Sequence, residues 1–424
     1  MRKIKNALVL AGGDSTRFWP LKGKVLFDFL GSPLILYQIR QLQKYADAVT
    51  VISARDNATT IGRLIENLEN KENVHIIVQK EGLEGQAGAI LTAKNHLQGE
   101  TIILNANDVF DYSFLEKIAR NPASGGKIIL TGKRQNEYFS GGYFRFDDNK
   151  NLVEIIEKPG PDALPSNVVR LVVDYFSDFS MIVKAIESVK TSSDDHYEKA
   201  INFILKGSGA REYVMYEGYW STLKYPWHVL AMLKTMLAAV KKTDIHDSAV
   251  ISKKALIIGP VVIGENARIG DFVKVVGPAF IGRNTVVGDY SLIRESQIGE
   301  DCLIGSYTEV ARSHIGNRVF LHRNYVGDSV LSDDSMMGSG AVTANLRFDG
   351  KTISSGSNDE TVDTNMDKLG AVLGSKSKIG VNSTMVPGVK IGQNCIIAPA
   401  EKVRFDLEDN TYLIRGEERI NQNA

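Results

Sequence analysis

The sequence is poor in cysteine, in net charge and in long apolar runs. Its two cysteines, Cys302 and Cys395, are too few and too far apart for a disulfide framework and favour structural thiols in a reducing compartment. Fifty basic and fifty acidic residues cancel, which argues against a nucleic acid or a membrane surface as a bulk partner. The most apolar later stretch, Val229 to Val240, carries Lys234 and is too short to cross a bilayer. We therefore expect a cytoplasmic protein with neither a nucleic-acid nor a membrane partner.

What the sequence has in abundance is a period of six residues. From about Ala249 to Ala344, and again from Leu369 to Ala400, an aliphatic or methionine side chain recurs every sixth residue, usually followed by glycine. The positions are Ile263, Ile269, Val275, Ile281, Val287, Ile293, Ile298, Ile304, Val310, Ile315, Leu321, Val326, an irregular Ser332, Met337, Leu373, Ile379, Met385, Ile391 and Ile397. This period fits neither a helix nor an alternating strand, and it is the signature of a hexapeptide parallel β-helix.

The residue behind each inward aliphatic marks a corner of the coil. It is normally glycine, because corners need positive φ or a crowded backbone, which Gly, Asn and Asp tolerate best. The exceptions are Val276, Arg294, Ala311, His322, Asp333, Val386 and Ala398. A side chain in this place leaves the coil and cannot add to its core. Arg294 and His322 are therefore candidates for surface chemistry, and the alternative is that they are inert corner residues.

The first half of the chain alternates between strands and helices. We expect strands at Ala7–Leu10, Ala48–Ser53, Val74–Val78, Thr101–Leu104 and Lys127–Gly132, and helices at Leu34–Tyr45 and Thr59–Glu69. Such alternation predicts a mostly parallel, Rossmann-like α/β sheet whose ligands bind beyond the carboxyl ends of the strands. The opening MRKIKNALVLAGG lacks the longer apolar region of a secretory signal, so it is expected to be the first strand.

The predicted organisation has three parts. Residues 1–225 form the α/β domain, 226–243 a linker helix with one apolar face, and 244–424 an all-β parallel β-helix. The polar stretch from Leu346 to Lys368 interrupts the hexads and is too long for a corner. We expect it to be either a functional loop or a flexible excursion.

A glycine-rich turn directly follows the first predicted strand. The segment LAGGDSTRFWPLKGKVLFDF, Leu10 to Phe29, exposes backbone N–H groups and is followed by two cations, Arg17 and Lys24. This pattern favours a nucleoside triphosphate held by the turn, with the cations stabilising charge on the attacked phosphoryl group. It is neither a P-loop nor a spaced dinucleotide fingerprint. The alternative is a solvated turn with two surface cations.

Several motifs together resemble the sugar-1-phosphate nucleotidylyltransferases. These are the glycine turn with Arg17 and Lys24-Val-Leu, the loop LEGQAGA (Leu83–Ala89), NANDVF around Asp108, Gly141-Gly142, and IIEKP (Ile155–Pro159). With the β-helix attached, nearly the whole chain resembles the bifunctional glucosamine-1-phosphate acetyltransferase / N-acetylglucosamine-1-phosphate uridylyltransferase family and its archaeal counterparts. That family coils its β-helix left-handed, forms trimers and takes UTP or, in related enzymes, dTTP.

The resemblance implies roles in nucleotidyl transfer, in which a sugar-1-phosphate attacks the α-phosphorus and pyrophosphate leaves. Arg17 and Lys24 are the implied catalytic cations, and Asp108 is the implied ligand of Mg²⁺. Gly142 and Glu157 hold the sugar and Lys158 its phosphate. The implied nucleotide-binding residues are Leu10, Ala11, Gly12, Gly13, Gln79 and Gly85.

The resemblance also implies an acetyltransferase site on the β-helix. In LHRNYVGDSV, His322 corresponds to the general base that takes a proton from an amino sugar as it attacks the thioester of acetyl-coenzyme A. The implied acceptor contacts are Arg294, Tyr325, Asn345 and Lys351. Val381 and Ala398 lie in hexads that resemble the acetyl-coenzyme A groove.

Some positions depart from the family pattern. Thr222 stands where the family has its second metal-binding aspartate, Gly23 replaces a proline, and an asparagine before a later strand is missing, with Asp174 the nearest polar residue. Asp14, beside the glycine turn, could supply the missing charge. Ala311 replaces a lysine that grips the sugar phosphate, with Arg312 beside it as a possible substitute, and Met336 replaces an asparagine.

Three hypotheses follow. The first is a bifunctional enzyme that makes a nucleotide-activated N-acetylhexosamine. The second is a single-activity nucleotidylyltransferase whose β-helix only oligomerises, and the third is a non-catalytic protein that binds a nucleotide sugar. The joint presence of Arg17, Lys24, Asp108, Glu157 and Lys158 disfavours the third, whereas Thr222 keeps it open.

Overall fold

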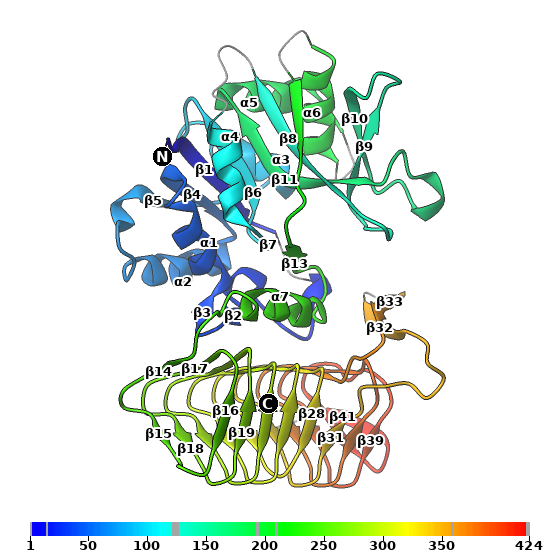
Figure 1. The fold of residues 1–424 in the computed structure, drawn as a ribbon. Helices are drawn as coiled ribbons and strands as arrows, with labels where there is room; N and C mark the ends of the chain where they lie inside the picture. The colour runs from blue at the N-terminus through cyan, green and yellow to red at the C-terminus, as the bar shows by residue number, and fades with distance from the viewer. Residues whose placement is uncertain are drawn as a thin grey trace. The chain divides into compact units, whose positions relative to one another are not determined.

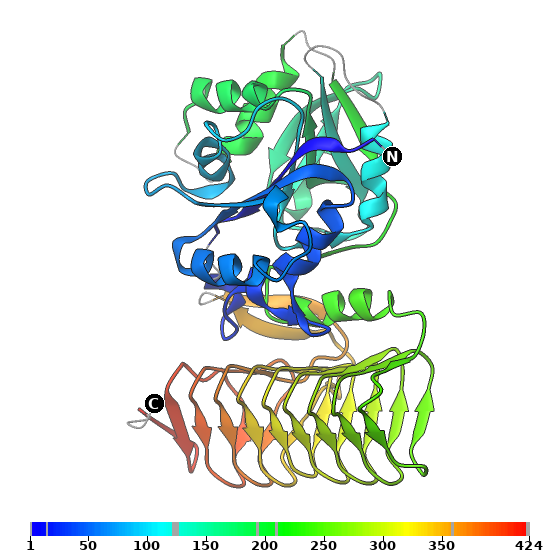
Figure 2. The same cartoon turned by 90° about the vertical axis from the view of Figure 1, so that its left-hand side faces the viewer.

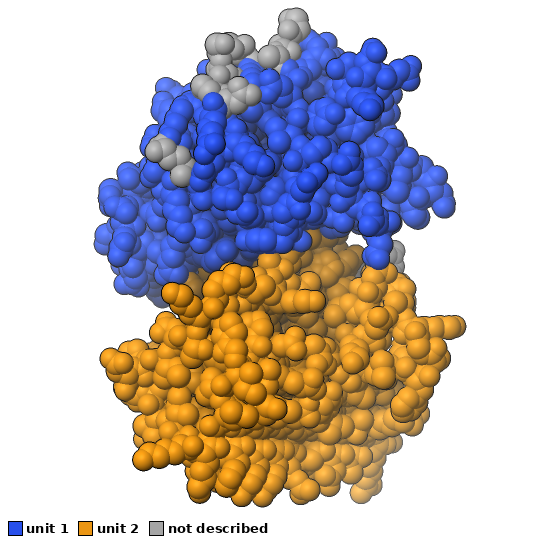
Figure 3. Space-filling view, viewed as in Figure 1, with its two compact units in different colours: residues 1–14, 34–220 blue, residues 15–33, 221–424 orange. Residues whose placement is uncertain are grey.

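The structure, a computed structural model, describes residues 2–13, 16–120, 127–191, 195–207, 211–357 and 360–420. The chain divides into two compact units (Figure 3). Unit 1 comprises residues 1–14 and 34–220, and unit 2 comprises residues 15–33 and 221–424. The units therefore do not follow chain order, because a short early segment belongs with the second half. Asp14 lies outside the described residues.

Unit 1 is built around a nine-stranded sheet. Strands β10, β9, β11, β6, β1, β4 and β5 are neighbours in this order, and β8 joins β11 to β12. Their bounds are β1 (Ile4–Ala11), β4 (Ala46–Ser53), β5 (Val74–Val78), β6 (Thr101–Asn105), β8 (Ile128–Arg134), β9 (Gly142–Phe146), β10 (Leu152–Glu157), β11 (Val168–Phe176) and β12 (Arg211–Met215). Strands β6, β1, β4 and β5 run parallel, and β11 runs antiparallel to β6. The five predicted strands and the Rossmann-like α/β class are confirmed.

Helices cover this sheet because the crossovers between parallel strands must pass over its faces. They are α1 (Leu34–Leu42), α2 (Arg55–Ile65), α3 (Gly85–Thr92), α4 (Leu115–Ala119), α5 (Phe179–Ser188) and α6 (His196–Leu205). Helices α3, α5 and α6 share one buried apolar cluster with the sheet, which includes Ile90, Ile182 and Ile201. Figure 1 shows α5 and α6 lying beside each other over the strands. The predicted helix Thr59–Glu69 begins and ends four residues earlier.

Unit 2 is a left-handed parallel β-helix of the hexapeptide type, and its coils stack as a ladder of short strands (Figure 2). Three sheets form its sides. The first contains β14 (Asp244–Ile245), β17 (Val261–Ile263), β20 (Ala279–Ile281), β23 (Gln297–Ile298), β26 (His314–Ile315), β29 (Val330–Leu331), β34 (Val372–Leu373) and β37 (Lys390–Ile391). The second contains β15 (Val250–Ile251), β18 (Arg268–Ile269), β21 (Val286–Val287), β24 (Leu303–Ile304), β27 (Phe320–Leu321), β30 (Met336–Met337), β35 (Lys378–Ile379), β38 (Ile396–Ile397), β40 (Thr411–Ile414) and β41 (Glu417–Ile420). The third contains β16 (Leu256–Ile258), β19 (Lys274–Val276), β22 (Leu292–Arg294), β25 (Glu309–Ala311), β28 (Tyr325–Gly327), β31 (Val342–Thr343), β36 (Thr384–Met385) and β39 (Lys402–Val403).

The hexad prediction of the core is confirmed at every aliphatic and methionine position. All of these side chains are at most 3% exposed and belong to one continuous apolar cluster. The prediction that Ser332 occupies an inward place was wrong. Leu331 occupies that place, pairs with Leu373 on the next coil and is fully buried. The corner residue of that coil is therefore Ser332, and Asp333 lies one position beyond it. A step of five residues from Val326 to Leu331 caused the error, since shortened steps shift the register without an obvious glycine.

Two different demands shape the corners. A Cβ on Gly282 would lie 2.5 Å from the carbonyl oxygen of Gly299 on the next coil, so the first corner place is crowded by backbone. Positive φ occurs two residues later, at Asn284 (φ 55°) in the same corner. Glycine is thus required for close approach, and asparagine for the left-handed backbone.

The polar stretch from Leu346 to Lys368 contains a hairpin. Strands β32 (Ile353–Ser357) and β33 (Glu360–Met366) pair antiparallel and stand away from the coils (Figure 1). Ile353 is 1% exposed, which ties the hairpin to the body of unit 2. The described residues of the stretch therefore form an ordered excursion, a point that the sequence alone left open.

The remaining elements of unit 2 include the early segment and a helix. The segment contains η1 (Thr16–Phe18), η2 (Lys24–Leu26), β2 (Asp28–Phe29) and β3 (Ser32–Pro33). The predicted linker helix is α7 (His228–Leu237), shorter than expected at both ends, and it contacts β26 of the β-helix. None of the helices formed by the described residues has the length and apolar character needed to cross a membrane.

Candidate functional sites

The glycine turn of unit 1 lies against the side chain of Gln79. A Cβ on Gly12 would lie only 1.6 Å from Gln79 Oε1, whereas nothing lies within 4 Å of the place of a Cβ on Gly13. Gln79 follows β5, the second neighbour of β1 in the sheet. Its Oε1 is buried without a hydrogen-bond partner among the described residues. The turn therefore has one backbone position closed by Gln79 and one open to a ligand.

The predicted base-recognition loop lies against the same glutamine. Gln79 Nε2 donates to the carbonyl oxygen of Leu83 at 2.6 Å and approaches that of Gly85 at 3.3 Å. Gly85 begins α3 with φ +65°, and a Cβ on Gly88 would lie 2.3 Å from the carbonyl carbon of Leu83. The structure thus brings Gly12, Gln79 and Gly85 together, and both loop glycines are sterically required.

The predicted sugar-binding residues also lie together. Gly142 of β9 pairs with Glu157 of β10, and a Cβ on Gly142 would lie 3.0 Å from Glu157 Oε2. Lys158 Nζ lies 3.5 Å from Glu157 Oε1, and the backbone N–H of Lys158 donates to Gly141 O at 3.1 Å. Lys158 has positive φ (46°), which turns the chain directly after the strand. The arrangement offers a carboxylate and an ammonium group side by side.

A buried charge cluster accompanies this hairpin, and sequence reasoning missed it. Arg170 of β11 donates to Glu198 of α6 at 2.8 Å and also binds Asp174, with all three side chains nearly inaccessible. The ring of Tyr197 lies 4.6 Å from the guanidinium carbon. Two opposite charges and hydrogen bonds make burial of the arginine tolerable. Asp174, the nearest polar residue to the place of the missing asparagine, is an internal partner of Arg170.

Asp108 begins the short strand β7 (Asp108–Phe110) and is 7% exposed. The carbonyl oxygen of Asp108 accepts a hydrogen bond of 2.6 Å from Gln38 Nε2. No group of three His, Cys, Asp or Glu side chains that could hold a metal ion occurs among the described residues. The donor set therefore fits Mg²⁺ only as an ion that shares one carboxylate and takes its other ligands from water and substrate phosphates.

The two predicted catalytic cations belong to unit 2. Arg17 lies in η1 and is exposed, and Lys24 begins η2 with its Nζ 5.8 Å from the ring centroid of Phe18. Gly23 before it has φ +61°, a conformation that proline cannot adopt. The departure from the family's proline therefore reflects a different local backbone. Lys24 also contributes, after burial and Lys224, to lowering the pKa of His228 to about 4.

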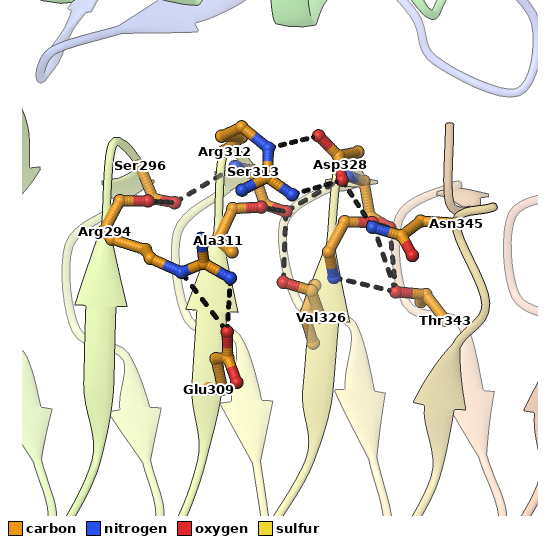
Figure 4. A network of polar contacts seen from close by, with 12 residues as sticks. Arg294, Ser296, Glu309, Ala311, Arg312, Ser313, Val326, Asp328, Thr343 and Asn345 are labelled. Carbon is orange, nitrogen blue, oxygen red and sulfur yellow. Dashed lines mark hydrogen bonds and ion pairs between the residues drawn. The ribbon is translucent and has the colours of Figure 1, made fainter. Parts of the chain in front are cut away.

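The third sheet of the β-helix and its following corner carry a polar network that includes two of the predicted acceptor residues, Arg294 and Asn345 (Figure 4). Arg294, at the end of β22, donates from Nη2 to Glu309 Oε1 at 2.6 Å and from Nε at 3.2 Å. Ala311 follows Arg294 on the next coil and is fully buried, so it offers no polar group. About a third of the Arg294 side chain remains accessible, which leaves it able to meet an anion.

The neighbouring corner is occupied by Arg312, Asp328 and Asn345. Arg312 forms two parallel bonds with Asp328, Nε to Oδ1 at 2.6 Å and Nη2 to Oδ2 at 2.7 Å. Asn345 Nδ2 binds both Asp328 Oδ2 and the hydroxyl of Tyr325, the latter at 3.2 Å. The pKa of Arg312 is raised, first by its hydrogen bond to Asp328. Asp328 therefore holds Arg312 in the corner that follows Ala311.

His322 lies at the corner that precedes β28, so Tyr325 begins the strand that His322 leads into. Its imidazole is exposed, and its backbone N–H donates to the side-chain oxygen of Asn324. Asn324 is buried and also donates to two carbonyl oxygens of the next coil, at 2.8 and 2.9 Å. Hydrogen bonds of Asn324 therefore hold the backbone of the corner, while the imidazole of His322 is exposed.

The remaining predicted residues lie elsewhere on unit 2. Lys351 is exposed, and its backbone N–H donates to Asp349 at 3.3 Å, outside the network of Figure 4. Val381 and Ala398 lie at the same corner of adjacent coils. The Ala400 N–H donates to Val381 O at 2.8 Å, and a Cβ on Gly380 would lie 2.6 Å from the carbonyl carbon of Ala398. Met336 is 43% exposed on the second sheet.

Sequence reasoning missed Glu309 and Asp328, which hold Arg294 and Arg312. A signal existed: an acidic residue follows each arginine at a distance of 15 or 16 residues, close to one coil. Asp328 follows Gly327, the register partner of Ala311, and so lies beside Arg312 on the next coil. Glu309 pairs with Leu292, two residues before Arg294, and reaches the arginine diagonally. A search for opposite charges one coil apart would have found both pairs.

An α/β nucleotidyltransferase unit and a hexapeptide β-helix in one chain define a bifunctional class of transferases. The nucleotidyl transferase family matches residues 6–223, the "GMPPB C-terminal domain" residues 239–355, and the "hexapeptide repeat of succinyl-transferase" residues 371–398. The chain belongs to the family of bifunctional sugar-1-phosphate nucleotidylyltransferases/acetyltransferases. It is an enzyme with nucleotidyltransferase and acetyltransferase domains.

Three relatives illustrate this membership. The chain is 29% identical to the "Bifunctional protein GlmU" of Methanocaldococcus jannaschii over 98% of each chain. It is 31% identical to the "Bifunctional sugar-1-phosphate nucleotidylyltransferase/acetyltransferase" of Sulfurisphaera tokodaii, over 95% of this chain and 98% of that one. It is 25% identical to a "Putative mannose-1-phosphate guanyltransferase" of Sulfolobus acidocaldarius, over 63% of this chain and 73% of that one. The family generally uses Mg²⁺ and acetyl-coenzyme A, and its substrates are nucleoside triphosphates and sugar phosphates.

Proposed function

We propose that this chain makes a nucleotide-activated N-acetylhexosamine in two steps. The β-helix acetylates an amino-sugar-1-phosphate with acetyl-coenzyme A, and the product then receives a nucleotidyl group from UTP or dTTP. Residues 1–225 catalyse nucleotidyl transfer and residues 244–424 catalyse acetyl transfer. Residues 226–243 connect the two domains. The observation that carries the proposal is that a partly accessible Arg294, held by Glu309, and a hydrogen-bonded pair, Tyr325 and Asn345, lie on the β-helix that also exposes His322.

In acetyl transfer, the amine of the sugar attacks the thioester carbonyl of acetyl-coenzyme A, an amide bond forms and the thiol leaves. His322 takes the proton that the amine loses, because a neutral imidazole is a suitable base near pH 7. Arg294 and Tyr325 bind the sugar phosphate, and Asn345 lies near the amine. Val381 and Ala398 line the groove for acetyl-coenzyme A, and Lys351 completes the acceptor contacts in an assembled trimer.

In nucleotidyl transfer, a phosphate oxygen of the sugar-1-phosphate attacks the α-phosphorus in line and pyrophosphate leaves. Leu10, Ala11, Gly12 and Gly13 present backbone groups to the nucleotide, with Gln79 and Gly85 toward the base. Arg17 binds the departing pyrophosphate and Lys24 the α-phosphate, so both neutralise charge that grows in the transition state.

The sugar-1-phosphate is held by unit 1. Glu157 accepts hydrogen bonds from sugar hydroxyls, Gly142 gives them room, and Lys158 pairs with the phosphate. Asp108 would hold Mg²⁺, which when bound neutralises phosphate charge. The two free, buried thiols at Cys302 and Cys395 support a reducing, cytoplasmic setting.

A screen of both half-reactions tests this function. Pyrophosphate release is measured with four nucleoside triphosphates against several sugar-1-phosphates, and thiol release with acetyl-coenzyme A and glucosamine-1-phosphate. We expect pyrophosphate release with UTP or dTTP and thiol release with an amino sugar. No thiol release with any amino-sugar phosphate would overturn the bifunctional function.

A single-activity nucleotidylyltransferase is the second candidate, and a specific observation favours it. Ala311 is fully buried and Met336 presents an apolar side chain, so two polar contacts of the family's acceptor site have no counterpart at these places. In this case the β-helix only assembles subunits. Pyrophosphate release without thiol release distinguishes it from the first.

A further inference from the structure

The segment that carries the two nucleotidyl-transfer cations is anchored on the β-helix. Residues 15–33 form one compact unit with residues 221–424, although some 190 residues of unit 1 lie between them in sequence (Figure 3). Arg17 and Lys24 both lie in this segment. The side chains that hold it therefore decide where these cations stand.

The first anchor is a pair of polar residues on adjacent coils. Gln297 and His314 are in register on β23 and β26, and both are 1% exposed. The backbone N–H of Leu30 donates to Gln297 Oε1 at 2.7 Å, and His314 Nε2 lies 2.7 Å from the carbonyl oxygen of Asp28. Because a carbonyl only accepts, His314 carries its proton on Nε2. These bonds satisfy the Leu30 N–H and His314 Nε2, whose burial would otherwise be costly, whereas His314 Nδ1 is buried without a partner among the described residues.

Aromatic contacts extend from this anchor toward the cations. The imidazole of His314 lies 4.8 Å from the ring of Phe27, and the ring of Phe27 meets that of Phe18 edge-on at 5.6 Å. Phe18 is fully buried, follows Arg17 directly and lies beneath Lys24 Nζ. A continuous series of packed rings therefore connects His314 with the positions of both cations.

A second anchor holds the other end of the segment. Trp19 Nε1 donates to Asp409 Oδ1 at 2.9 Å, and Lys390 Nζ lies 4.7 Å from the centre of the Trp19 ring. Lys390 is 3% exposed and pairs with Asp406 at 3.2 Å. The segment is thus fixed at Trp19 and at Asp28–Leu30, on either side of Lys24.

We propose that Gln297, His314 and Asp409 of the β-helix are positioning residues for nucleotidyl transfer, because they fix the segment that bears Arg17 and Lys24. This inference rests on the proposed function of those two cations. A misplacement of about 1 Å in such groups costs about 100-fold in rate, so the β-helix contributes to the first activity as well as housing the second.

The test compares Gln297→Ala, His314→Ala and Asp409→Ala with His246→Ala, a histidine on the first coil that does not touch the segment. For each full-length variant, kcat and KM are measured for pyrophosphate release, thiol release is measured in the same preparation, and deuterium uptake is followed in peptides covering 16–33. We expect kcat for pyrophosphate release to fall by about 10- to 100-fold with KM less affected, faster deuterium uptake, and thiol release within about twofold of the unmodified enzyme. His246→Ala should change none of these.

His314→Gln provides a rescue, because its amide N–H can still donate to Asp28 O, and it should recover part of the lost kcat. A variant with faster uptake in 16–33 and unchanged pyrophosphate release would overturn the positioning role alone. Absence of pyrophosphate release in the unmodified enzyme would overturn the proposed function and this inference together. Equal losses of both activities in all three variants, without rescue by His314→Gln, would show a general structural role and also overturn it.

Discussion

Arg312 and Asp328 form a two-pronged ion pair between adjacent coils, with bonds of 2.6 and 2.7 Å. Asp328 also binds Asn345, so the guanidinium fixes the carboxylate that in turn orients the amide. The side chain of Asp328 is 9% exposed, which shields the pair from solvent. Through Asp328, Arg312 is therefore linked to Asn345, a residue of the proposed acceptor site.

Arg312→Lys keeps the charge but cannot form two parallel bonds. We expect KM for the amino-sugar phosphate to rise about 10-fold, equivalent to about 1.4 kcal/mol, with a smaller change in kcat. Thiol-release kinetics measure this. Arg318→Lys is the matched control, since Arg318 also forks an aspartate sixteen residues on, at 2.7 and 3.0 Å, in a different corner. Equal changes in both variants would contradict the assignment.

His322→Gln removes the proposed base and retains a polar side chain. We expect thiol release to fall by about 10²- to 10⁴-fold, because general-base catalysis contributes that range. Pyrophosphate release should stay unchanged, and His246→Gln should leave both activities intact. Thiol release at the original rate in the His322→Gln variant would refute its role as base.

Thr222→Asp restores a carboxylate where the family has its second metal ligand. We expect the Mg²⁺ concentration for half-maximal pyrophosphate release to fall severalfold, because two carboxylates bind the ion more tightly than one. Thr222→Asn is the neutral control of the same shape. The expectation fails if both variants show the same Mg²⁺ dependence.

His314 and Asp28 should contribute to the pH dependence of stability with opposite signs. Burial lowers the pKa of His314 from 6.5 to about 4, so its contribution is present above pH 6.5 and is lost as the pH falls toward 4. Burial raises the pKa of Asp28 from 3.8 to about 6, so its contribution is present below pH 3.8 and is lost as the pH rises through 6. Each difference is worth up to about 3 kcal/mol.

Denaturant unfolding between pH 4 and 7 measures both effects. As the pH falls, the free energy of unfolding of the His314→Gln variant should decrease less than that of the unmodified protein, because glutamine does not take up a proton. That of the Asp28→Asn variant should decrease less as the pH rises, because its side chain no longer ionises. Two variants that changed the pH profile in the same direction would contradict these assignments.

Gly299→Ala should destabilise unit 2, because the added Cβ would lie 2.4 Å from the carbonyl oxygen of Gly316 on the next coil. Forcing coils apart costs about 1–3 kcal/mol in the free energy of unfolding. Gly62→Ala is the control with the opposite sign: its Cβ would lie 3.9 Å from Ile76, and alanine favours the α2 helix by about 1 kcal/mol. Thermal unfolding compares the two, and a neutral Gly299→Ala would show that the coils can separate.

The sequence could predict those sites whose residues lie close together along the chain or at a fixed repeat spacing. Gly142, Glu157 and Lys158 come together through one hairpin, and Arg294, Tyr325 and Asn345 through adjacent coils, so spacing and motif sufficed. Asp28 and His314 are 286 residues apart, and no local pattern connects them. The sequence cannot predict such contacts, because neither the helical period nor the six-residue period relates the two positions.

The sequence by itself determined the coil, since one buried side chain every six residues leaves no other way to bury that stripe. It also determined five of the nine strands of the α/β sheet and the order of the chemical motifs. Only the tertiary structure decided that Leu331 rather than Ser332 faces the core and that residues 15–33 belong with the β-helix. The physical reason is the same in both cases: periodicity dictates which side chains are buried within an element, whereas packing between distant segments depends on shape and polar partners that no repeat encodes.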